Sequence, residues 1–185
     1  MATVNTTWTS PASATLDKAT GATIDETMTD AWSSNLYNLG GTAGYIGARV
    51  YHAATQSATN GTPLTLAFNS ERVDSDPNGA IHDTVTNNSR LTVRTGGLYL
   101  ITGTAAFASN ATGYRSLSVL QNGANYIATQ TVPAISGNDQ CLSIATVYLL
   151  SASDYVELQA TQTSGGALNV QTASAYSPEF TLTKV

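Results

Sequence analysis

Charged residues are scarce in this chain: they make up 10% of its 185 residues, against about 25% in an average soluble domain. The seven Lys and Arg residues are scattered, so no basic patch is present to neutralise nucleic-acid phosphates. No apolar run approaches the roughly 20 residues that a membrane-spanning helix needs. Residues 1–10 lack the positive start and apolar stretch of a signal peptide. We therefore expect neither a nucleic-acid nor a membrane partner.

Motifs for catalysis are also missing. The sequence has no Gly-x-Ser-x-Gly elbow, no phosphate-binding loop that ends in Lys-Ser/Thr and no Cys-x-x-Cys pair. The single Cys141 cannot form an intrachain disulfide, and its apolar surroundings predict a small buried residue. His82 neighbours Asp83, but no nucleophile accompanies the pair. We therefore expect no enzymatic activity, and we interpret His82 as a turn or interface residue.

Small uncharged residues take the place of charge. The chain is rich in Thr, Ser, Asn, Ala and Gly, while 42% of it is hydrophobic and its net charge is −5. This is enough apolar material for a packed core, and Thr favours strands. A weakly charged surface suits a protein that packs against copies of itself, such as a virus particle protein assembled in the host cytoplasm.

The residues before Gly40-Gly41 predict an extended arm followed by one amphipathic helix. Thr23 and Glu26 match a capping box, and Gly40 suits the position just after a helix. The arm carries Trp8, and the helix places large apolar residues on one face. Neither can bury this surface alone, so we expect both to contact the β-domain, a neighbouring subunit or a separate partner. The expected attachment residues are Trp8, Ile24, Met28, Trp32, Leu36 and Leu39.

After Gly41 the pattern changes to alternating or short apolar runs bounded by turn residues, which is typical of strands. Asn122-Gly123 is a strong hairpin signal, because a type I′ turn needs positive φ at both central residues. Gly165-Gly166 predicts a second hairpin. About ten short strands at this spacing predict an antiparallel sandwich or jelly roll. The expected strands are 48–54, 64–68, 90–94, 98–107, 114–121, 126–133, 141–150, 155–163, 168–172 and 179–185.

The turn that starts at Asp74 resembles half of a calcium loop. Asp74, Asp76 and Asn78 offer oxygen ligands at alternate positions, and Gly79 suits the sharp bend. The twelfth position is Val85, where a calcium loop has its bidentate Glu. The favoured interpretation is an ordinary Asp/Asn/Gly surface turn. A weak calcium site completed by Asp83 or by a neighbouring subunit is the alternative; otherwise no cofactor is expected.

From about Arg49 onward, the order of several short motifs resembles the C1q/TNF-like jelly-roll domains of tailed-bacteriophage structural proteins. Residues 96–101 (GGLYLI) resemble the central Gly-x-Tyr strand of that family. Residues 154–158 (DYVEL) resemble its Gly-Asp-x-Val-x-Leu strand, with Ser153 in place of the Gly. Further matching runs are 64–69, 82–83, 90–93, 113–115, 121–123, 165–170 and 177–180. Residues 8–39 are similar to the arm and helix that precede such domains.

This resemblance implies a ten-strand jelly roll that forms a trimer about a threefold axis. It divides the chain into residues 1–43, an attachment segment, and residues 44–185, the jelly-roll domain. We expect a homotrimeric capsid decoration or cement protein on the virion surface, bound through its arm to the major capsid protein. The alternative is a tail-fibre head or a receptor-binding protein of the tail tip, with tail proteins as partners. The absence of shaft-like repeats favours decoration.

Overall fold

The structure is a computed structural model that describes residues 14–17, 22–24, 44–173 and 176–185. The chain divides into two compact units, Met1–Gly44 and Tyr45–Val185. In the first unit, β1 (Ala14–Asp17) pairs antiparallel with β2 (Ala22–Ile24). The sequence predicted that Ile24 starts a helix, but Ile24 ends β2 opposite Ala14, because a β-branched residue also favours a strand. Residues 25–39 of the expected helix lie outside the described residues.

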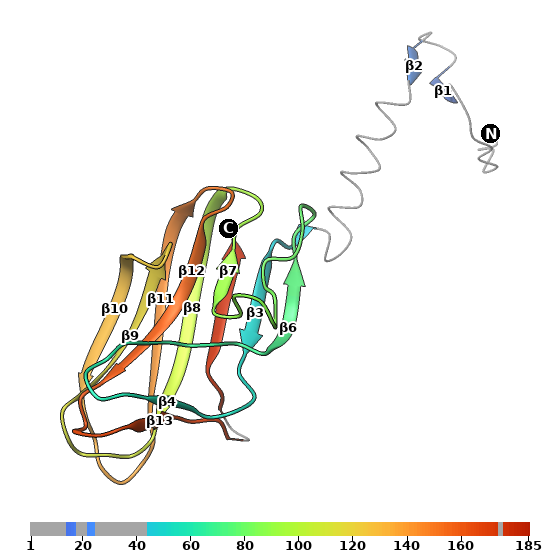
Figure 1. Cartoon of the computed structure of the whole chain (residues 1–185). Coiled ribbons are helices and arrows are strands. Elements are labelled where there is room, and N and C mark those ends of the chain that lie inside the picture. The colour runs from blue at the N-terminus through green and yellow to red at the C-terminus, as the bar shows by residue number, and fades with distance from the viewer. Residues whose placement is uncertain (1–13, 18–21, 25–43, 174–175) are drawn as a thin grey trace. The chain divides into compact units, whose positions relative to one another are not determined.

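The second unit is a sandwich of two antiparallel sheets (Figure 1). The smaller sheet has five strands in the order β10-β9-β12-β5, with β7 also paired to β12. The larger sheet has seven strands in the order β4-β13-β8-β14-β3-β6, with β11 paired to β8. The predicted all-β antiparallel sandwich is thereby confirmed.

The bounds of the strands show how the chain alternates between the two sheets. The smaller sheet contains β5 (Leu64–Thr65), β7 (Arg90–Thr92), β9 (Tyr114–Gln121), β10 (Asn125–Pro133) and β12 (Tyr155–Gln162). The larger sheet contains β3 (Gly47–Tyr51), β4 (Gln56–Ala58), β6 (Ser70–Ser75), β8 (Gly97–Phe107), β11 (Gln140–Leu150), β13 (Leu168–Val170) and β14 (Glu179–Lys184).

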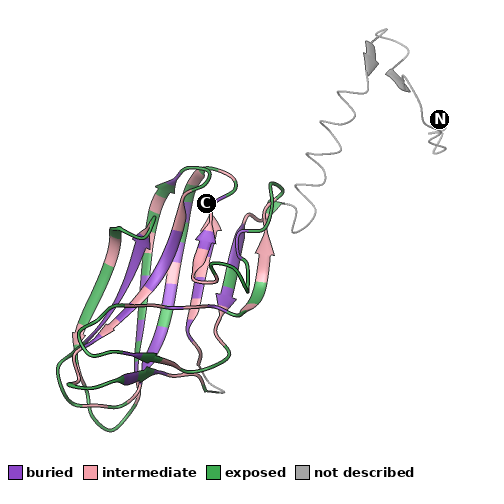
Figure 2. Ribbon diagram, in the orientation of Figure 1, coloured by how far each residue is buried: buried purple, intermediate pink, exposed green. Residues whose placement is uncertain are grey.

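The core lies between the two sheets, where alternate residues of each long strand point inward. Figure 2 shows buried positions alternating with partly or fully exposed ones along several strands. Phe68 and Phe180 stack with ring centroids 5.8 Å apart. Gly103 of β8 lies so close to the opposite sheet that a Cβ there would meet Leu158 Cδ1 at 2.5 Å. A larger residue at Gly103 would therefore require the Leu158 side chain to move.

The two predicted hairpin turns have different outcomes. Asn122 and Gly123 have φ values of 53° and 71°, and β9 pairs with β10 on either side of them, so this turn is confirmed. The hairpin predicted at Gly165-Gly166 is wrong, because β12 and β13 belong to different sheets. The glycines do allow a turn, but β12 already pairs with β9 on one side and with β5 and β7 on the other.

A polar side chain closes one end of the core. Arg115 of β9 is fully buried, and its guanidinium donates to the backbone oxygens of Asn110, Thr112 and Tyr114. Burial lowers the pKa of Arg115, but an arginine keeps its charge in proteins. These bonds tie the loop between β8 and β9 to the sandwich.

Candidate functional site

The structure leaves most of the predicted attachment residues untested. Trp8, Met28, Trp32, Leu36 and Leu39 lie outside the described residues, and Ile24 is placed only as the end of β2. Among the described residues, no helix is long and apolar enough to cross a membrane. The candidate sites of the described part therefore have to be found on the jelly-roll unit.

The turn that starts at Asp74 uses its polar groups to hold its own backbone. The Asp74 carboxylate accepts hydrogen bonds from the backbone N–H groups of Ile81 and His82, both at 3.0 Å. Asp76 Oδ1 accepts from the Asn78 backbone and from the Thr95 hydroxyl, both at 2.9 Å. Within the described ranges, no group of three or more His, Cys, Asp or Glu residues is arranged to hold a metal ion.

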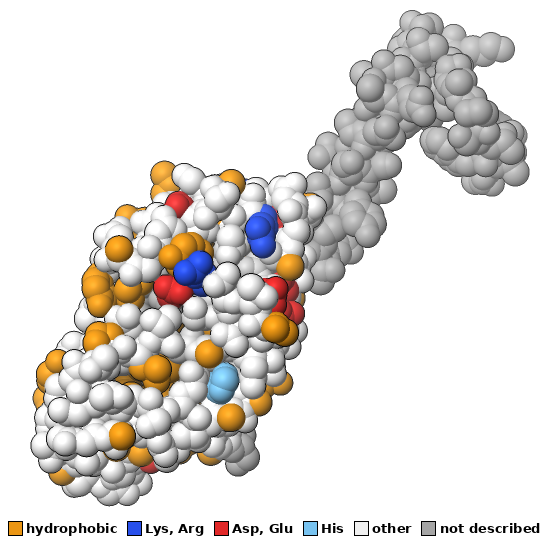
Figure 3. All heavy atoms as spheres, viewed as in Figure 1, with side chains coloured by type: hydrophobic (Ala, Val, Ile, Leu, Met, Phe, Trp, Pro, Cys, Tyr) orange, Lys and Arg blue, Asp and Glu red, His pale blue; other side chains and the backbone are white. Residues whose placement is uncertain are grey.

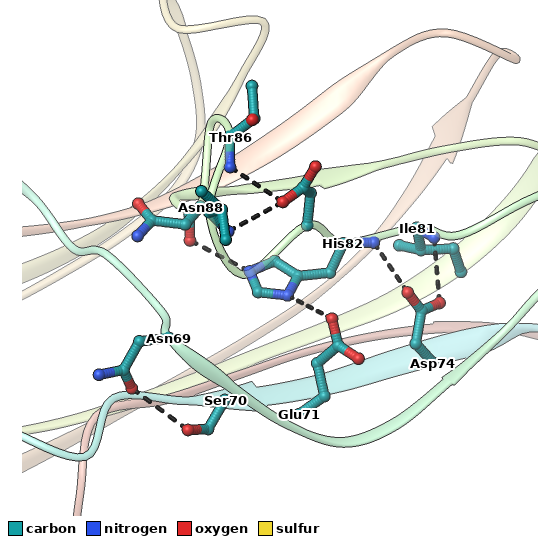
Figure 4. Close-up of polar contacts among 10 residues, drawn as sticks. Asn69, Ser70, Glu71, Asp74, Ile81, His82, Thr86 and Asn88 are labelled. Carbon is teal, nitrogen blue, oxygen red and sulfur yellow. Dashed lines mark hydrogen bonds and ion pairs between the residues drawn. The ribbon is translucent and has the colours of Figure 1, made fainter.

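His82 is more deeply placed than a turn or interface residue would be. Its side chain is fully buried, and both ring nitrogens face acceptors: Glu71 Oε1 lies 2.9 Å from Nδ1, and the Asn88 backbone oxygen lies 3.1 Å from Nε2. Figure 4 shows the ring between these two partners, with Asp74 beside the backbone of the same segment. Together these contacts fasten the segment between β6 and β7 to the sheet.

Asp83, the sequence neighbour of His82, points elsewhere. Its carboxylate accepts from the backbone N–H groups of Val85 and Thr86, and these bonds, Thr86 first, lower its pKa. Asp83 thus forms a local turn, while Glu71 is the carboxylate that contacts the His82 ring. The neighbouring pair in the sequence is not a functional pair in space.

The outer face of the larger sheet carries an exposed apolar strip. We use this name for Leu98, Leu100, Val147, Leu149 and Val185, which are 37–72% exposed. Leu98 lies opposite Leu149, and Leu100 lies opposite Val147, in the β8–β11 ladder. The Val185 N–H donates to the Leu98 oxygen, so the strip continues to the end of β14. Tyr99 and Ile101, which alternate with these residues in β8, are fully buried in the core.

The same outer face also carries Cys141. The sequence predicted that this thiol is buried, but the residue is exposed. Its neighbour Leu142 points into the core instead, because alternate residues of a strand face opposite sides of the sheet. The apolar run was therefore recognised correctly, but the side of the sheet was not.

An uncharged edge strand borders the smaller sheet. β10 is the last strand in its order, and none of its nine residues is charged. Its Tyr126 is 56% exposed. Edge strands usually carry charge or proline, which prevents further pairing; here the only such residue is Pro133 at the end of the strand. More generally, the face seen in Figure 3 carries only a few charged side chains among many uncharged ones.

A cluster of two arginines and one glutamate occupies another part of the larger sheet. Arg49 of β3 donates through Nε and Nη2 to Glu179 Oε2, and Arg72 of β6 donates through Nε and Nη2 to Glu179 Oε1. Although burial alone would raise it, the pKa of Glu179 is lowered by these two arginines. Arg72 also lies 4.5 Å from the centre of the Tyr51 ring. The cluster keeps one net positive charge.

The surface beside this cluster is hollowed. One hollow of about 320 Å³ is lined by Tyr51, His52, Arg72, Tyr176 and Glu179, among others. Two further hollows, of about 300 and 330 Å³, share Glu179 and Arg49. Together they follow the outer face of the larger sheet from β3 across β14 to β8 and β11.

Comparisons with known proteins identify the fold. No protein family and no curated protein sequence matches the chain. Its structure is similar to Eiger TNF from S. frugiperda, with 13% identity over 76% of this chain and 92% of that one and a TM-score of 0.56. It is also similar to murine APRIL, with 12% identity and a TM-score of 0.58. That match covers 76% of this chain and 99% of murine APRIL. A third similar structure is the globular domain of the zebrafish complement 1qA protein, with 16% identity and a TM-score of 0.53. The match covers 76% of this chain and 97% of that one.

These similarities establish a C1q/TNF-like jelly roll for residues 45–185, as the resemblance in the sequence implied. At such low identities they show the fold alone. Function has to be argued from the surfaces of this chain: the apolar strip, the β10 edge and the hollowed arginine cluster.

Proposed function

We propose that the chain is a non-enzymatic structural protein that forms a homotrimer on the surface of a virus particle, as a decoration or cement protein bound to the major capsid protein. The observation that carries the self-association is the apolar strip. Five aliphatic residues in register on one exposed sheet face are unusual for a monomer, since large exposed apolar patches mark interaction sites. Copies of the chain are the simplest partner for a surface that is otherwise nearly uncharged.

The energy available at the strip is large enough to support association. Burying one large aliphatic side chain contributes roughly 1.5–3 kcal/mol. Leu149 is 72% exposed and Val185 is 67% exposed. Most of the burial free energy of these two side chains can therefore still be gained in a contact with a second chain. Part of the gain is offset by the loss of translational and rotational freedom on binding.

A threefold assembly needs two different surfaces on each chain, because a cyclic trimer contact joins unlike patches. The described unit offers both: the apolar strip on β8, β11 and β14, and the uncharged edge at β10. We propose that the β10 side of one chain packs against the strip of the next. None of the residues of β8, β10 and β11 is charged, so these strands bring no unpaired charge into the contact.

The test is a substitution at Leu149, the most exposed residue of the strip. Leu149→Asp would place a carboxylate in the buried contact with the neighbouring chain. We therefore expect the dissociation constant of the trimer to rise by more than about tenfold. The mass in solution, from sedimentation equilibrium, should fall from three chains of 19.2 kDa to one. Val85→Asp is the matched control, because Val85 is 83% exposed in a loop and its substitution should leave the trimer intact.

A wild-type protein that stays monomeric at micromolar concentration would contradict the assembly, and so would a Leu149→Asp trimer. The position on the particle is tested separately with labelled antibodies. Label over the whole head supports a decoration protein. Label at the tail alone would replace this assignment with a tail-fibre head or tail-tip receptor-binding protein.

A further inference from the structure

We propose that the hollow at Arg72 and Glu179, which we call the arginine groove, binds a sugar that carries a carboxylate. The groove lies at the β3 and β6 side of the larger sheet, and none of the residues that line it belongs to the apolar strip. This inference therefore goes beyond self-association: it gives the assembled protein a ligand.

The first argument is charge. The single carboxylate of Glu179 is shared by Arg49 and Arg72, so one positive charge remains uncompensated. Each guanidinium donates Nε and Nη2 to Glu179, and neither Nη1 makes a hydrogen bond within the described part of the chain. The two side chains are 51% and 48% exposed. Donors that face solvent beside a net positive charge suit an incoming carboxylate.

The second argument is that the arginines are already held in place. Arg72 lies over Tyr51 and is bonded through two nitrogens to Glu179, while Arg49 is bonded to the other oxygen of the same carboxylate. A guanidinium fixed in this way loses little conformational freedom when a ligand binds. Surface arginines without such partners would have to be ordered first.

The third argument is the lining of the groove. Hydroxyl groups come from Thr172, Tyr176 and Ser177, and Ala53 and Ala173 are the aliphatic members. The Thr172 hydroxyl donates to the His52 backbone oxygen and the Tyr176 hydroxyl to the Asp139 carboxylate, so both can still accept a hydrogen bond from a ligand. His52 Nδ1 is enclosed and has no hydrogen-bond partner among the described residues. Burial lowers the pKa of His52, so its ring is neutral at pH 7 and can exchange hydrogen bonds with hydroxyl groups.

Size and lining together favour a sugar over an acidic peptide. A volume of about 320 Å³ lies at the lower end of the range of ligand sites, roughly 300–1,000 Å³, and fits one or two sugar rings. A bound peptide needs pockets for its apolar side chains, and the only aliphatic side chains of the lining are two alanines, beside the rings of Tyr51 and Tyr176. Sugar hydroxyls, in contrast, find hydroxyl, imidazole and guanidinium partners.

The experiment titrates the full-length protein with sodium glucuronate and, in parallel, with glucose, which has the same ring but no carboxylate. Binding is followed by NMR chemical-shift changes. We expect glucuronate to bind about tenfold or more tightly than glucose, and to shift the ring signals of His52 and Tyr51. Arg72→Gln should weaken glucuronate binding by a similar factor. Arg49 does not line this hollow, so Arg49→Gln, which removes a positive charge beside it, should weaken binding less.

Arg90→Gln is the matched control. Arg90 also contacts a carboxylate, Glu157, at 3.3 Å and lies 4.1 Å from a tyrosine ring, that of Tyr155, but it belongs to the smaller sheet. Its loss should leave glucuronate binding unchanged. Thermal unfolding and sedimentation of the same samples show that the variants remain folded and keep their assembly state.

Three outcomes would overturn the proposal. The first is no binding of glucuronate or of N-acetylneuraminate at millimolar concentration. The second is glucuronate binding that Arg72→Gln leaves intact. The third is binding of a glutamate-rich peptide at the groove in place of either sugar, which would assign the groove to a protein partner. Because assembly is measured separately, a failure here is distinguishable from a failure of the trimer.

Discussion

Ser153 occupies a backbone conformation that most side chains avoid. Its φ is 76°, in the left-handed region where only glycine is free of strain. The turn imposes this conformation: the Ser153 N–H donates to the Val93 oxygen, and the Asp154 N–H donates to the Ser151 oxygen. A glycine would meet no such strain here, which agrees with the Gly-Asp-x-Val-x-Leu motif that the sequence resembles at this position.

We predict that Ser153→Gly stabilises the protein. The relief of left-handed strain, about 1–2 kcal/mol, exceeds the extra chain entropy of glycine, about 0.5–1 kcal/mol. The free energy of unfolding in urea should therefore rise by up to about 1 kcal/mol. Ser151→Gly, in the same turn but without positive φ, should lower it. A loss of stability in Ser153→Gly would show that its side chain contributes more than the strain costs.

Neighbouring Asp154 shows how one residue connects two turns. Its carboxylate accepts from Asn122 at 2.8 Å, from Gln121 at 3.2 Å and from the Ser151 N–H at 2.8 Å. These bonds, that of Asn122 first, lower the pKa of Asp154. The sequence identified the Asn122-Gly123 turn from its φ requirement, but nothing in the sequence indicated its partner at Asp154, 32 positions away.

At the scale of elements, the segment between β6 and β7 depends on His82. Both ring nitrogens of His82 contact an acceptor, Glu71 Oε1 on one side and the Asn88 backbone oxygen on the other. Ile81, the neighbour of His82, is 1% exposed and belongs to the core, so His82 and Ile81 hold the segment together.

We predict that His82→Ala destabilises the protein by about 1–3 kcal/mol, because it removes a fully buried side chain together with its contacts to Glu71 and the Asn88 oxygen. Amide hydrogen exchange of residues 81–88 should become faster, while exchange in β8 should change less. His52→Ala is the control: Nδ1 of His52 already lacks a partner within the described ranges, so its loss should cost less. Equal losses in the two variants would contradict a specific role of His82.

The strands that the sequence predicted best are those with a clear apolar pattern. β9 was predicted to the residue, and the bounds of β8, β10 and β11 differ by one residue at one end. β4 and β6 were missed. They lie at the two edges of the larger sheet, and β6 has Val73 as its only large aliphatic residue. Such edge strands form through pairing with a neighbour, which a local pattern does not reveal.

The candidate sites were harder to predict than the strands. The apolar strip does leave a signal: residues 98–101 and 147–150 are apolar on both faces, which is typical of strands covered on both sides. A pattern cannot tell which face is covered by the chain itself. The arginine groove leaves no signal, because Glu179 is 130 positions from Arg49 and 107 positions from Arg72.

At the scale of the whole molecule, the jelly-roll unit closes its own core. The first residues of the unit are tied to the last strand: the Tyr45 hydroxyl contacts the Thr183 hydroxyl at 3.2 Å, and the Lys184 N–H donates to the Ile46 oxygen at 2.9 Å. The core residues come from both sheets, and all lie within residues 45–185.

We therefore predict that a chain that starts at Gly44 folds and assembles like the full-length protein. Its circular dichroism should keep the β-sheet signal. Its midpoint of thermal unfolding should stay within a few degrees of that of the full-length protein, because a change of about 1 kcal/mol in the free energy of unfolding shifts the midpoint of a domain of this size by roughly 2–4 °C. The trimer should also persist, because the apolar strip and the β10 edge both belong to the retained unit.

The shortened chain should fail to bind particles that lack the protein, whereas full-length protein should bind them. The physical reason is that Trp8, Trp32 and the apolar residues of 24–39 are expected to supply the contacts with the capsid, and large aromatic anchors dominate the energetics of such interfaces. The substitution Trp32→Ala in the full-length chain tests the same contact at a single residue. We expect it to weaken particle binding without changing the trimer. Unfolding of the shortened chain would show that the first unit completes the core. Binding that survives in the shortened chain would place the attachment surface on the jelly roll itself.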